Sequence, residues 1–421
     1  MGMIIRDWRW SVVALIALLA LIAWPVGCSQ LQDSPSRPTG TIQAEPVIRV
    51  RIQESKTETL LSAGQPPLVR TSSNRNPRQL NIPANTNVSI KLTGSGWTIG
   101  DSNVGKGELI IEPAAGNWLT VNDRPYRGNF RFVARTGDQF DAVNHVRIDD
   151  YLYSVLPREL FKLWELEAYK AQGIIARTYA LYEKKSQSPG LHWDVHTDTR
   201  SQVYGGIKDE TEKSRAAVDQ TAGIVVVHGP AGQEKIFKAY FSACCGGLSA
   251  SAAEAFGDAW SEPLSEQNVG TTCNISTNFN WGPIIVPRAE LSQRFRAWGA
   301  SKDHPLKGIG LITDIRVAQN NSVGRPVRFE ATDASRNRYS LRAEELRWAT
   351  NFNAPDAKTK LKSSFCRPIV QGDTVHFVDG HGHGHGAGMC QWCCQARALA
   401  GWKHEQIVLQ SYRGSKLARA Y

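Results

Sequence analysis

The sequence predicts an α+β fold in which a β-rich unit precedes a mixed region of helices and strands. Residues 47–135 contain short β-type runs such as VIRVRI and FRFVAR, separated by Gly, Asn, Asp and Pro turn residues. Residues 164–185 carry the first strong helical pattern, because apolar residues recur there at steps of three and four. Hydrophobic residues make up 41% of the 421 residues and charged residues 21%. This composition is typical of a folded globular protein and excludes a disordered chain or a multi-span membrane protein.

The chain begins with an export segment, residues 1–28. Two arginines precede an uncharged apolar run over residues 12–26, which is the pattern of a signal peptide. Cys28 follows as in a bacterial lipoprotein cleavage site, so we expect a lipid on Cys28 or an uncleaved membrane anchor, with no anchor as the third alternative. Residues 29–46 are rich in Ser, Pro, Gln and Thr and predict a flexible linker.

The folded part is therefore expected on the outer side of a membrane, in the periplasm or the cell wall. The full chain has 49 basic and 39 acidic residues, a net charge of +10 that favours an anionic polymer as partner. Export excludes nucleic acid and leaves cell-wall carboxylates or membrane phosphates. The simpler alternative is a basic surface that only aids solubility.

Further elements follow the long helix. Residues 209–221 predict a second helix, and GIVVVH at residues 223–228 predicts a strand. Residues 390–400 and 404–412 predict two helices near the C-terminus. The sequence contains no internal repeat, so a solenoid is not expected.

Glu159 is the candidate catalytic residue of the stretch 143–181. It follows Pro157 in LPREL among apolar residues, which predicts a turn or short helical cap leading into the long helix. Burial would raise the pKa of this carboxyl group, and a protonated glutamic acid can act as a general acid. From the residues alone, a helix-capping or salt-bridged glutamate is the alternative.

Two other stretches carry polar groups. WDVHTDTRSQVYGG, residues 193–206, has amide, hydroxyl and acid groups that suit sugar hydroxyl and acetamido groups, and equally a solvated loop. FVDGHGHGHGAGMCQWCCQARALAGW, residues 377–402, alternates Gly and His on a backbone free to adopt left-handed conformations. It predicts a metal site from His381, His383 and His385, a substrate-contacting loop or a tight structural turn.

Seven cysteines follow Cys28, namely Cys244, Cys245, Cys273, Cys366, Cys390, Cys393 and Cys394. An oxidising compartment favours disulfides among them, an odd count leaves one thiol over, and the spacing does not show the pairing. Cys390 and Cys393 form a Cys-x2-Cys pair, but no second such pair exists. We therefore expect no metal or other cofactor, with zinc as the alternative.

Several segments in a fixed order resemble the stage II sporulation protein D family, which also includes the amidase-enhancer proteins of bacterial cell walls. The resemblance covers residues 136–421. The matching segments are YLYSVLPREL with EAYKAQGIIARTYAL, DTRSQVYGG, YFSACCGG, GRPVRFE with SLRAEELRWA, and GHGHGHGAGMCQWCCQARALAGWKHEQIVLQSY. It implies that residues 136–421 form a mixed α/β catalytic region of this type, after the β-rich unit.

The resemblance implies a peptidoglycan lytic transglycosylase with Glu159 as its catalytic acid. Such an enzyme cleaves the bond between N-acetylmuramic acid and N-acetylglucosamine, leaves 1,6-anhydro ends and prefers strands stripped of stem peptides. Its mechanism needs one carboxyl group, whereas a two-carboxylate hydrolase would need Asp194 or Asp198 as the second. The resemblance also implies a cleft lined by Arg177, Thr178, Gln202, Tyr204, His383, His385 and Gln391.

This chain departs from the family in its cysteines. Some clostridial members hold zinc before the Gln-x-Tyr motif, where this chain has Val195 and Ser201, so that zinc site is not expected. Our disulfide hypothesis pairs Cys245 with Cys273 and joins Cys366 to the group beginning at Cys390. Two other functions stay open: a non-catalytic wall-binding enhancer of an N-acetylmuramoyl-L-alanine amidase, and a metal hydrolase built on the Gly-His loop.

Overall fold

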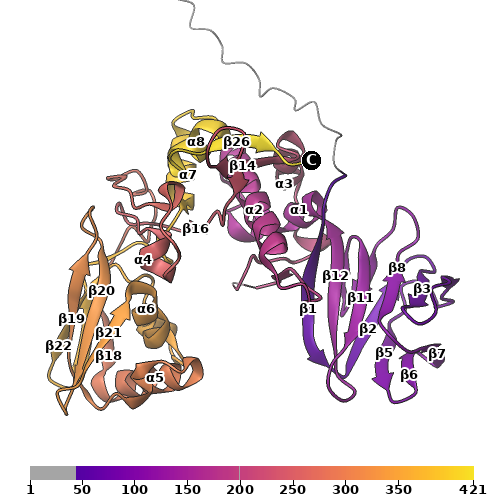
Figure 1. Ribbon diagram of the computed structural model, residues 1–421, viewed down its shortest axis with the longest axis horizontal. Coiled ribbons are helices and arrows are strands. Elements are labelled where there is room, and N and C mark those ends of the chain that lie inside the picture. The colour runs from indigo at the N-terminus through magenta and orange to yellow at the C-terminus, as the bar shows by residue number, and fades with distance from the viewer. Residues whose placement is uncertain (1–43, 199) are drawn as a thin grey trace, which may run out of the picture. The chain divides into compact units, whose positions relative to one another are not determined.

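The computed structural model describes residues 44–198 and 200–421, which adopt the predicted α+β fold (Figure 1). The export segment, Cys28 and nearly all of the expected linker lie outside the described residues. Among the residues that are described, no helix combines the length and the apolar character needed to cross a membrane.

Two sheets form the N-terminal part, and their strands pair antiparallel except at one edge of the larger sheet, where β13 pairs parallel with β1. In spatial order the larger sheet contains β13 (Val195–His196), β1 (Val47–Lys56), β12 (Phe140–Arg147), β11 (Asn129–Ala134), β8 (Leu109–Glu112), β3 (Leu68–Thr71) and β4 (Arg78–Gln79). The other sheet contains β10 (Arg124–Tyr126), β9 (Leu119–Val121), β2 (Glu58–Ala63), β5 (Val88–Thr93), β6 (Gly96–Ile99) and β7 (Ser102–Gly105). The predicted β-type runs VIRVRI and FRFVAR are confirmed as β1 and β11.

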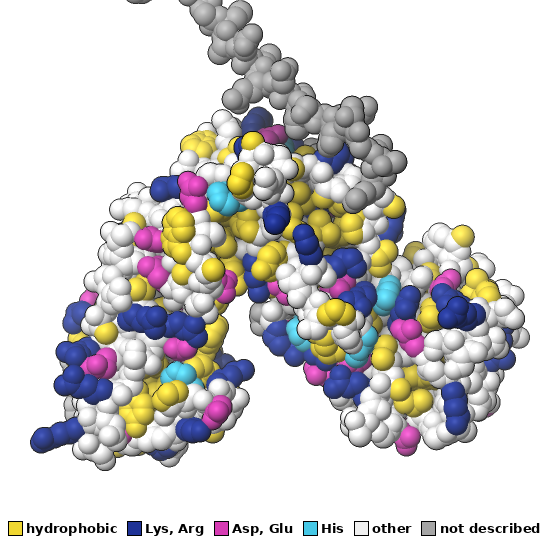
Figure 2. Space-filling view, in the orientation of Figure 1, with side chains coloured by type: hydrophobic (Ala, Val, Ile, Leu, Met, Phe, Trp, Pro, Cys, Tyr) yellow, Lys and Arg dark blue, Asp and Glu magenta, His cyan; other side chains and the backbone are white. Residues whose placement is uncertain are grey.

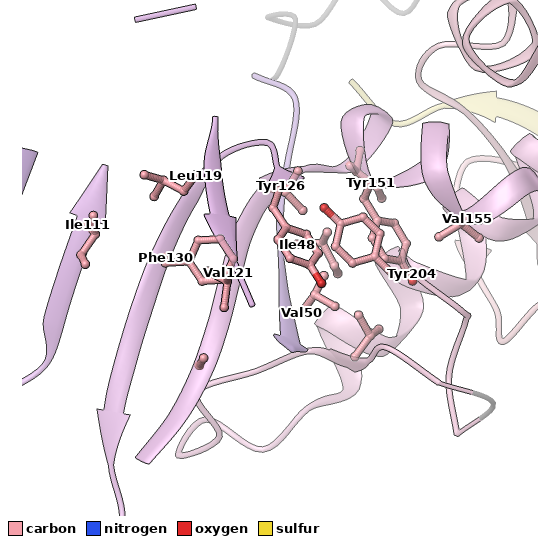
Figure 3. Packing of buried hydrophobic residues seen from close by; sticks show 14 of the residues in the cluster. Ile48, Val50, Ile111, Leu119, Val121, Tyr126, Phe130, Tyr151, Val155 and Tyr204 are labelled. Carbon is pink, nitrogen blue, oxygen red and sulfur yellow. The ribbon is translucent and has the colours of Figure 1, made fainter. Parts of the chain in front are cut away.

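One hydrophobic core joins these sheets to the first helix, α1 (Ile148–Glu159). Figure 3 shows Ile48 and Val50 of β1 near Tyr151 and Val155 of α1. The ring of Tyr204 lies 5.0 Å from that of Tyr151, so the loop before α3 packs on the same core. β12 lies beyond residue 135, yet it pairs with β1 on one side and β11 on the other. Packing therefore crosses the expected domain boundary at residue 135.

Helix α1 was not predicted. The sequence placed Glu159 in a turn or cap at the start of the next helix, but it is the last residue of α1. Pro157 lies inside the final turn of α1. A proline inside a helix removes one backbone donor and its ring crowds the preceding turn, and α1 ends two residues after Pro157.

The other predicted helices are confirmed, with ends shifted by at most three residues. The long helix is α2 (Leu166–Ser186), and the second is α3 (Glu212–Gln220). The predicted strand is β14 (Ile224–His228), which pairs with β15 (Lys235–Ile236) and β26 (Lys416–Arg419). The C-terminal helices are α7 (Gln391–Leu399) and α8 (His404–Ser411). Ala168 and Ala171 of α2 are fully buried in a core shared with β14, α7 and α8. Their small side chains allow the backbone of α2 to pack closely against these elements.

A separate core fills residues 281–377, where Phe295, Phe329 and Phe377 are fully buried. One three-stranded sheet contains β18 (Ile284–Pro287), β23 (Thr374–Val378) and β22 (Arg367–Gln371), and another contains β19 (Ile312–Asn320), β20 (Pro326–Asp333) and β21 (Arg338–Arg342). The helices of this region are α5 (Arg288–Lys302) and α6 (Ala343–Asn351).

Short elements connect these parts. They are α4 (Ala252–Phe256), the parallel pair β16 (Phe241–Ser242) and β25 (Met389–Cys390), the antiparallel pair β17 (Asn280–Trp281) and β24 (Gly380–His381), and the 3-10 turns η1 (Ile207–Asp209), η2 (Glu262–Leu264), η3 (Pro305–Gly308) and η4 (Ala357–Thr359). The pairing of β16 with β25 brings the YFSACCGG segment beside the start of α7, although about 150 residues separate them in sequence. Two widely spaced motifs therefore meet.

Candidate functional site

Glu159 ends α1 with its side chain partly buried. Its Oε1 accepts a hydrogen bond from the backbone N–H of Val203, 3.3 Å away. Burial raises the pKa of Glu159, because it penalises the charged carboxylate more than the Val203 N–H and the Gln391 amide favour it. The carboxyl group thus holds its proton to a higher pH than an exposed glutamate, as a general acid requires.

Gln391 is the first residue of α7 and faces Glu159. Its side-chain amide lowers the pKa of that carboxyl group. Its buried Nε2 makes no hydrogen bond of ordinary geometry with any described residue. The N-terminal end of a helix also favours negative charge nearby. The Gln391 amide can therefore donate a hydrogen bond to a carboxylate at position 159 or to a ligand beside it.

The loop that carries Val203 is held by buried side chains. The hydroxyl of Tyr151 donates to Oε1 of Gln202 at 3.2 Å, and the hydroxyl of Tyr204 donates to Oδ1 of Asn144 at 2.9 Å. Both tyrosines and Gln202 are buried. Gln202 and Tyr204 thus fix the position of the loop, and Nε2 of Gln202 remains without a described partner.

Arg177 and Thr178 lie in the core of α2, where their polar atoms bind the protein itself. The Arg177 guanidinium donates to Asp149 at 2.8 Å and 2.9 Å and to the hydroxyl of Tyr421 at 2.9 Å. The hydroxyl of Thr178 accepts from the N–H of Val226 at 3.0 Å. The cleft-lining position implied by the resemblance is not seen for these two side chains. Instead they hold α2 to α1 and β14.

The Gly-His loop adopts the tight structural turn, not the extended strand that would align its imidazoles. Gly382 and Gly384 have positive φ angles of 73° and 90°. A Cβ on Gly382 would lie 2.6 Å from the carbonyl oxygen of Cys244, and one on Gly384 would lie 2.7 Å from Oγ of Ser242. Glycine is thus required, because the loop packs against the backbone after β16.

The three imidazoles of this loop point to different surroundings. The ring of His381 lies 4.7 Å from that of Phe365, and the ring of His385 lies 5.0 Å from that of Phe256. Burial lowers the pKa of His385 to about 4, so it is neutral at pH 7. His383 is exposed. These histidines form no metal-ligand group in the part of the chain that the structure describes.

Neither candidate for a second catalytic carboxylate is free. Asp194 is fully buried, and its oxygens accept from Arg49 at 2.7 Å to 2.9 Å. Asp198 is exposed and pairs with Arg200 at 2.8 Å. At the two positions compared with the clostridial zinc site, Val195 is apolar and the Ser201 hydroxyl accepts from the backbone N–H of His196 at 3.1 Å.

An aromatic cluster missed by the sequence reasoning follows Glu159. The ring of Phe161 lies tilted 5.6 Å from that of Trp392 and 5.4 Å from that of Trp164, and the two tryptophan rings are 4.9 Å apart. Phe161 is 61% exposed and Leu163 is 89% exposed. The available signal was the aromatic content of LFKLW and CQW, of which only the rings of LFKLW were interpreted, as apolar neighbours of Glu159. An exposed ring two residues from the Glu159 carboxyl group suits stacking against a sugar ring.

The expected disulfides are not formed in the structure. Sγ of Cys245 lies 3.6 Å from Sγ of Cys273, too far for an S–S bond of about 2 Å. Cys366 is buried in the separate core of residues 281–377 and does not join the other cysteines. Instead, four buried sulfur atoms lie within 4.8 Å of one another, here called the sulfur cluster: Cys245, Cys273, Cys390 and Cys393.

Residues 136–228, which contain Glu159, α1, α2 and the Val203 loop, match the family model described as stage II sporulation protein. The chain carries a domain of this family. The assignment to the stage II sporulation protein D and amidase-enhancer family agrees with the resemblance, and it supports a function related to the cell wall.

Three relatives extend the similarity beyond this domain. An uncharacterized protein of Brachyspira hyodysenteriae is 27% identical over 335 residues, covering 79% of this chain and 83% of the relative. The amidase enhancer of Bacillus subtilis is 25% identical over 303 residues, covering 63% of this chain and 40% of the relative. An uncharacterized protein of Chlamydia pneumoniae is 27% identical over 207 residues, covering 48% of this chain and 73% of the relative.

Proposed function

We propose that this protein is a peptidoglycan lytic transglycosylase that uses Glu159 as its single acid and base. The observation that carries the proposal is a partly buried carboxyl group with a raised pKa, held by the Val203 N–H and facing the donor of Gln391. The substrate is the glycan strand, on stretches stripped of stem peptides. No metal or cofactor takes part in the reaction.

In the first step Glu159 donates its proton to the glycosidic oxygen between N-acetylmuramic acid and N-acetylglucosamine. The bond from this oxygen to the anomeric carbon breaks, and positive charge develops on the sugar as it flattens. The N-acetylglucosamine side leaves with a free 4-hydroxyl group. The Glu159 carboxylate is then stabilised by the N–H of Val203 and by Nε2 of Gln391.

In the second step the carboxylate takes the proton of the muramic acid 6-hydroxyl group. The 6-oxygen bonds to the anomeric carbon and forms the 1,6-anhydro ring, so water is not consumed and Glu159 is again protonated. The partnered states of Asp194 and Asp198 support this one-carboxylate route over a two-carboxylate hydrolysis.

The glycan strand is proposed to lie along Phe161 and Trp392, where exposed aromatic surface adjoins Glu159. Lysine and arginine side chains are spread over the face seen in Figure 2 and do not gather in one patch. The net charge of +10 therefore adds a general attraction to the anionic wall, while the aromatic rings give the local contact.

We further propose that the chain is exported and tethered to the outer side of a membrane through residues 1–28, by a lipid on Cys28 or an uncleaved anchor. The apolar run behind two arginines supports this proposal. The second candidate function is a wall-binding enhancer of a cell-wall amidase. It is favoured by the similarity to the Bacillus amidase enhancer.

Purified protein incubated with intact and amidase-stripped peptidoglycan distinguishes the two functions. We expect anhydro-muramic ends, detected by mass spectrometry, from wild type and from Glu165→Gln, a matched control on an exposed glutamate six residues away. Glu159→Gln should produce none. Wall binding without anhydro products, together with stimulation of an added amidase by wild type and Glu159→Gln alike, would instead establish the enhancer.

A further inference from the structure

The sulfur cluster brings together cysteines from three separate segments. Cys245 follows β16, Cys273 lies in the turn before β17, and Cys390 and Cys393 begin α7 (Figure 1). Their side chains are between 0% and 7% exposed. Four thiols thus lie buried side by side, although an apolar core would be packed as well by alanine or valine.

The spacing of the sulfur atoms decides what they suit. Sγ of Cys245 lies 3.6 Å from Sγ of Cys273 and 4.0 Å from Sγ of Cys393. Zinc–sulfur bonds of about 2.3 Å in a tetrahedron put neighbouring sulfur atoms about 3.8 Å apart. A disulfide needs about 2 Å. In a cluster of several irons the thiolates bind different metal atoms and so lie farther apart than around one ion.

We infer that Cys245, Cys273, Cys390 and Cys393 bind one Zn²⁺ ion as four thiolates in a closed, structural site. On binding, the four thiols release their protons to solvent, and each sulfur donates an electron pair to the metal. Four protein ligands leave no open position for water or substrate, so the ion does not enter the reaction. The sequence alone predicts no metal, because it contains one Cys-x2-Cys pair and no second one.

Backbone donors around Cys390 support this assignment. Its Sγ accepts from the N–H of Cys245 at 3.3 Å and from the N–H of Cys393 at 3.4 Å. Two N–H groups aimed at one sulfur stabilise a thiolate and orient it toward a metal, as outer hydrogen bonds do in metal sites. Such donors would contribute little to a neutral thiol.

Two arginines offset the charge of the site. Zn²⁺ with four thiolates has a net charge of −2, which is costly to bury alone. The fully buried guanidinium of Arg325 donates to the carbonyl oxygen of Cys245 at 2.8 Å. Arg397 lines a small cavity together with Cys245, Cys390 and Cys393. Two positively charged side chains therefore lie close to residues of the sulfur cluster.

The site would fasten the first turn of α7 to the segment after β16. That turn carries Gln391, which faces Glu159, and Trp392, which packs on Phe161. This positioning role for the ion rests on the proposed function, whereas zinc binding itself does not. The two are therefore tested by different measurements.

Zinc binding is tested on the full chain by elemental analysis and native mass spectrometry. We expect one zinc ion per chain in wild type and in two controls, Cys366→Ser and Cys394→Ser, which change buried cysteines outside the cluster. Cys273→Ser and Cys393→Ser should lose the ion. Should these two fail to fold, wild type refolded with Co²⁺ decides, because four thiolates around cobalt give intense sulfur-to-metal charge-transfer bands.

Peptide mapping after alkylation under denaturing, non-reducing conditions provides the opposing outcome. All four cysteines should be alkylated once the metal is removed. A Cys245–Cys273 or Cys390–Cys393 disulfide in metal-free wild type would overturn the inference, and so would stoichiometric iron in place of zinc. Neither result depends on glycan cleavage, so the proposed function stands or falls separately.

Discussion

The Glu159 site and the sulfur cluster meet at the start of α7, yet their residues come together in different ways. Glu159 obtains its apolar surroundings largely from neighbours along the chain. In the sulfur cluster, Cys273 and Cys393 lie 28 and 148 residues after Cys245. A reactive carboxyl group can thus be found from local sequence, whereas a ligand set built from distant segments becomes visible only when the fold brings them together.

The largest expected effect comes from Glu159→Gln, which should change catalysis at the Glu159 site without changing the sulfur cluster. Glu159→Gln should lower the rate of anhydro-end formation by about 10²–10⁴-fold, because an amide cannot donate and recover a proton. Its zinc content should equal that of wild type. Measuring both on one preparation sharpens the comparison. Loss of zinc in this variant would show that the two sites are not independent.

Removal of the metal should have the next largest effect, which we expect to be a loss of stability. Chelation of wild type at neutral pH should lower the free energy of unfolding by on the order of 5 kcal/mol, because metal binding is coupled to folding. Thermal unfolding with and without chelator measures it. Cys394→Ser should keep the chelator response and Cys273→Ser should lack it. An unchanged wild-type Tm would break the comparison.

Phe161→Ala should weaken glycan binding by about 10-fold while leaving the fold intact. The ring is 61% exposed, so its removal costs little core packing, but stacking against a sugar is lost. Steady-state kinetics should show this mainly in KM. Trp260→Ala, which removes an exposed ring on another segment, is the control and should bind as wild type does. Equal losses in both variants would point to a nonspecific surface effect.

The smallest effect concerns the pH dependence of stability. Burial raises the pKa of Glu159 in the folded state above its ordinary value of 4.5, so the folded protein binds the proton more tightly than the unfolded chain. Stability is therefore lost as pH rises through the folded pKa, and no penalty remains below 4.5. Glu159→Gln should raise Tm by about 1–2 °C at neutral pH. The difference from wild type should vanish in acid, and a difference independent of pH would contradict the assignment.

Local patterns predicted much of the fold, because the periodicity of apolar residues reflects which side of an element is buried. The strands of VIRVRI and FRFVAR, the helix α2 and the two C-terminal helices could all be predicted in this way. Helix α1 could not, because Pro157 indicated a break where the structure has a last helical turn. Tertiary packing of α1 on the β1 strand outweighs that local preference.

The sequence by itself determined the α+β class, the position of Glu159 in apolar surroundings and the presence of seven cysteines in the described part of the chain. Only the tertiary structure decided which of these residues contact one another. It buries Arg177 against Asp149, aims the Val203 N–H at Glu159 and converts the Gly-His repeat into a turn packed on the cysteine segment. Spacing along a chain constrains near neighbours, but contacts between distant segments depend on how strands and helices pack together.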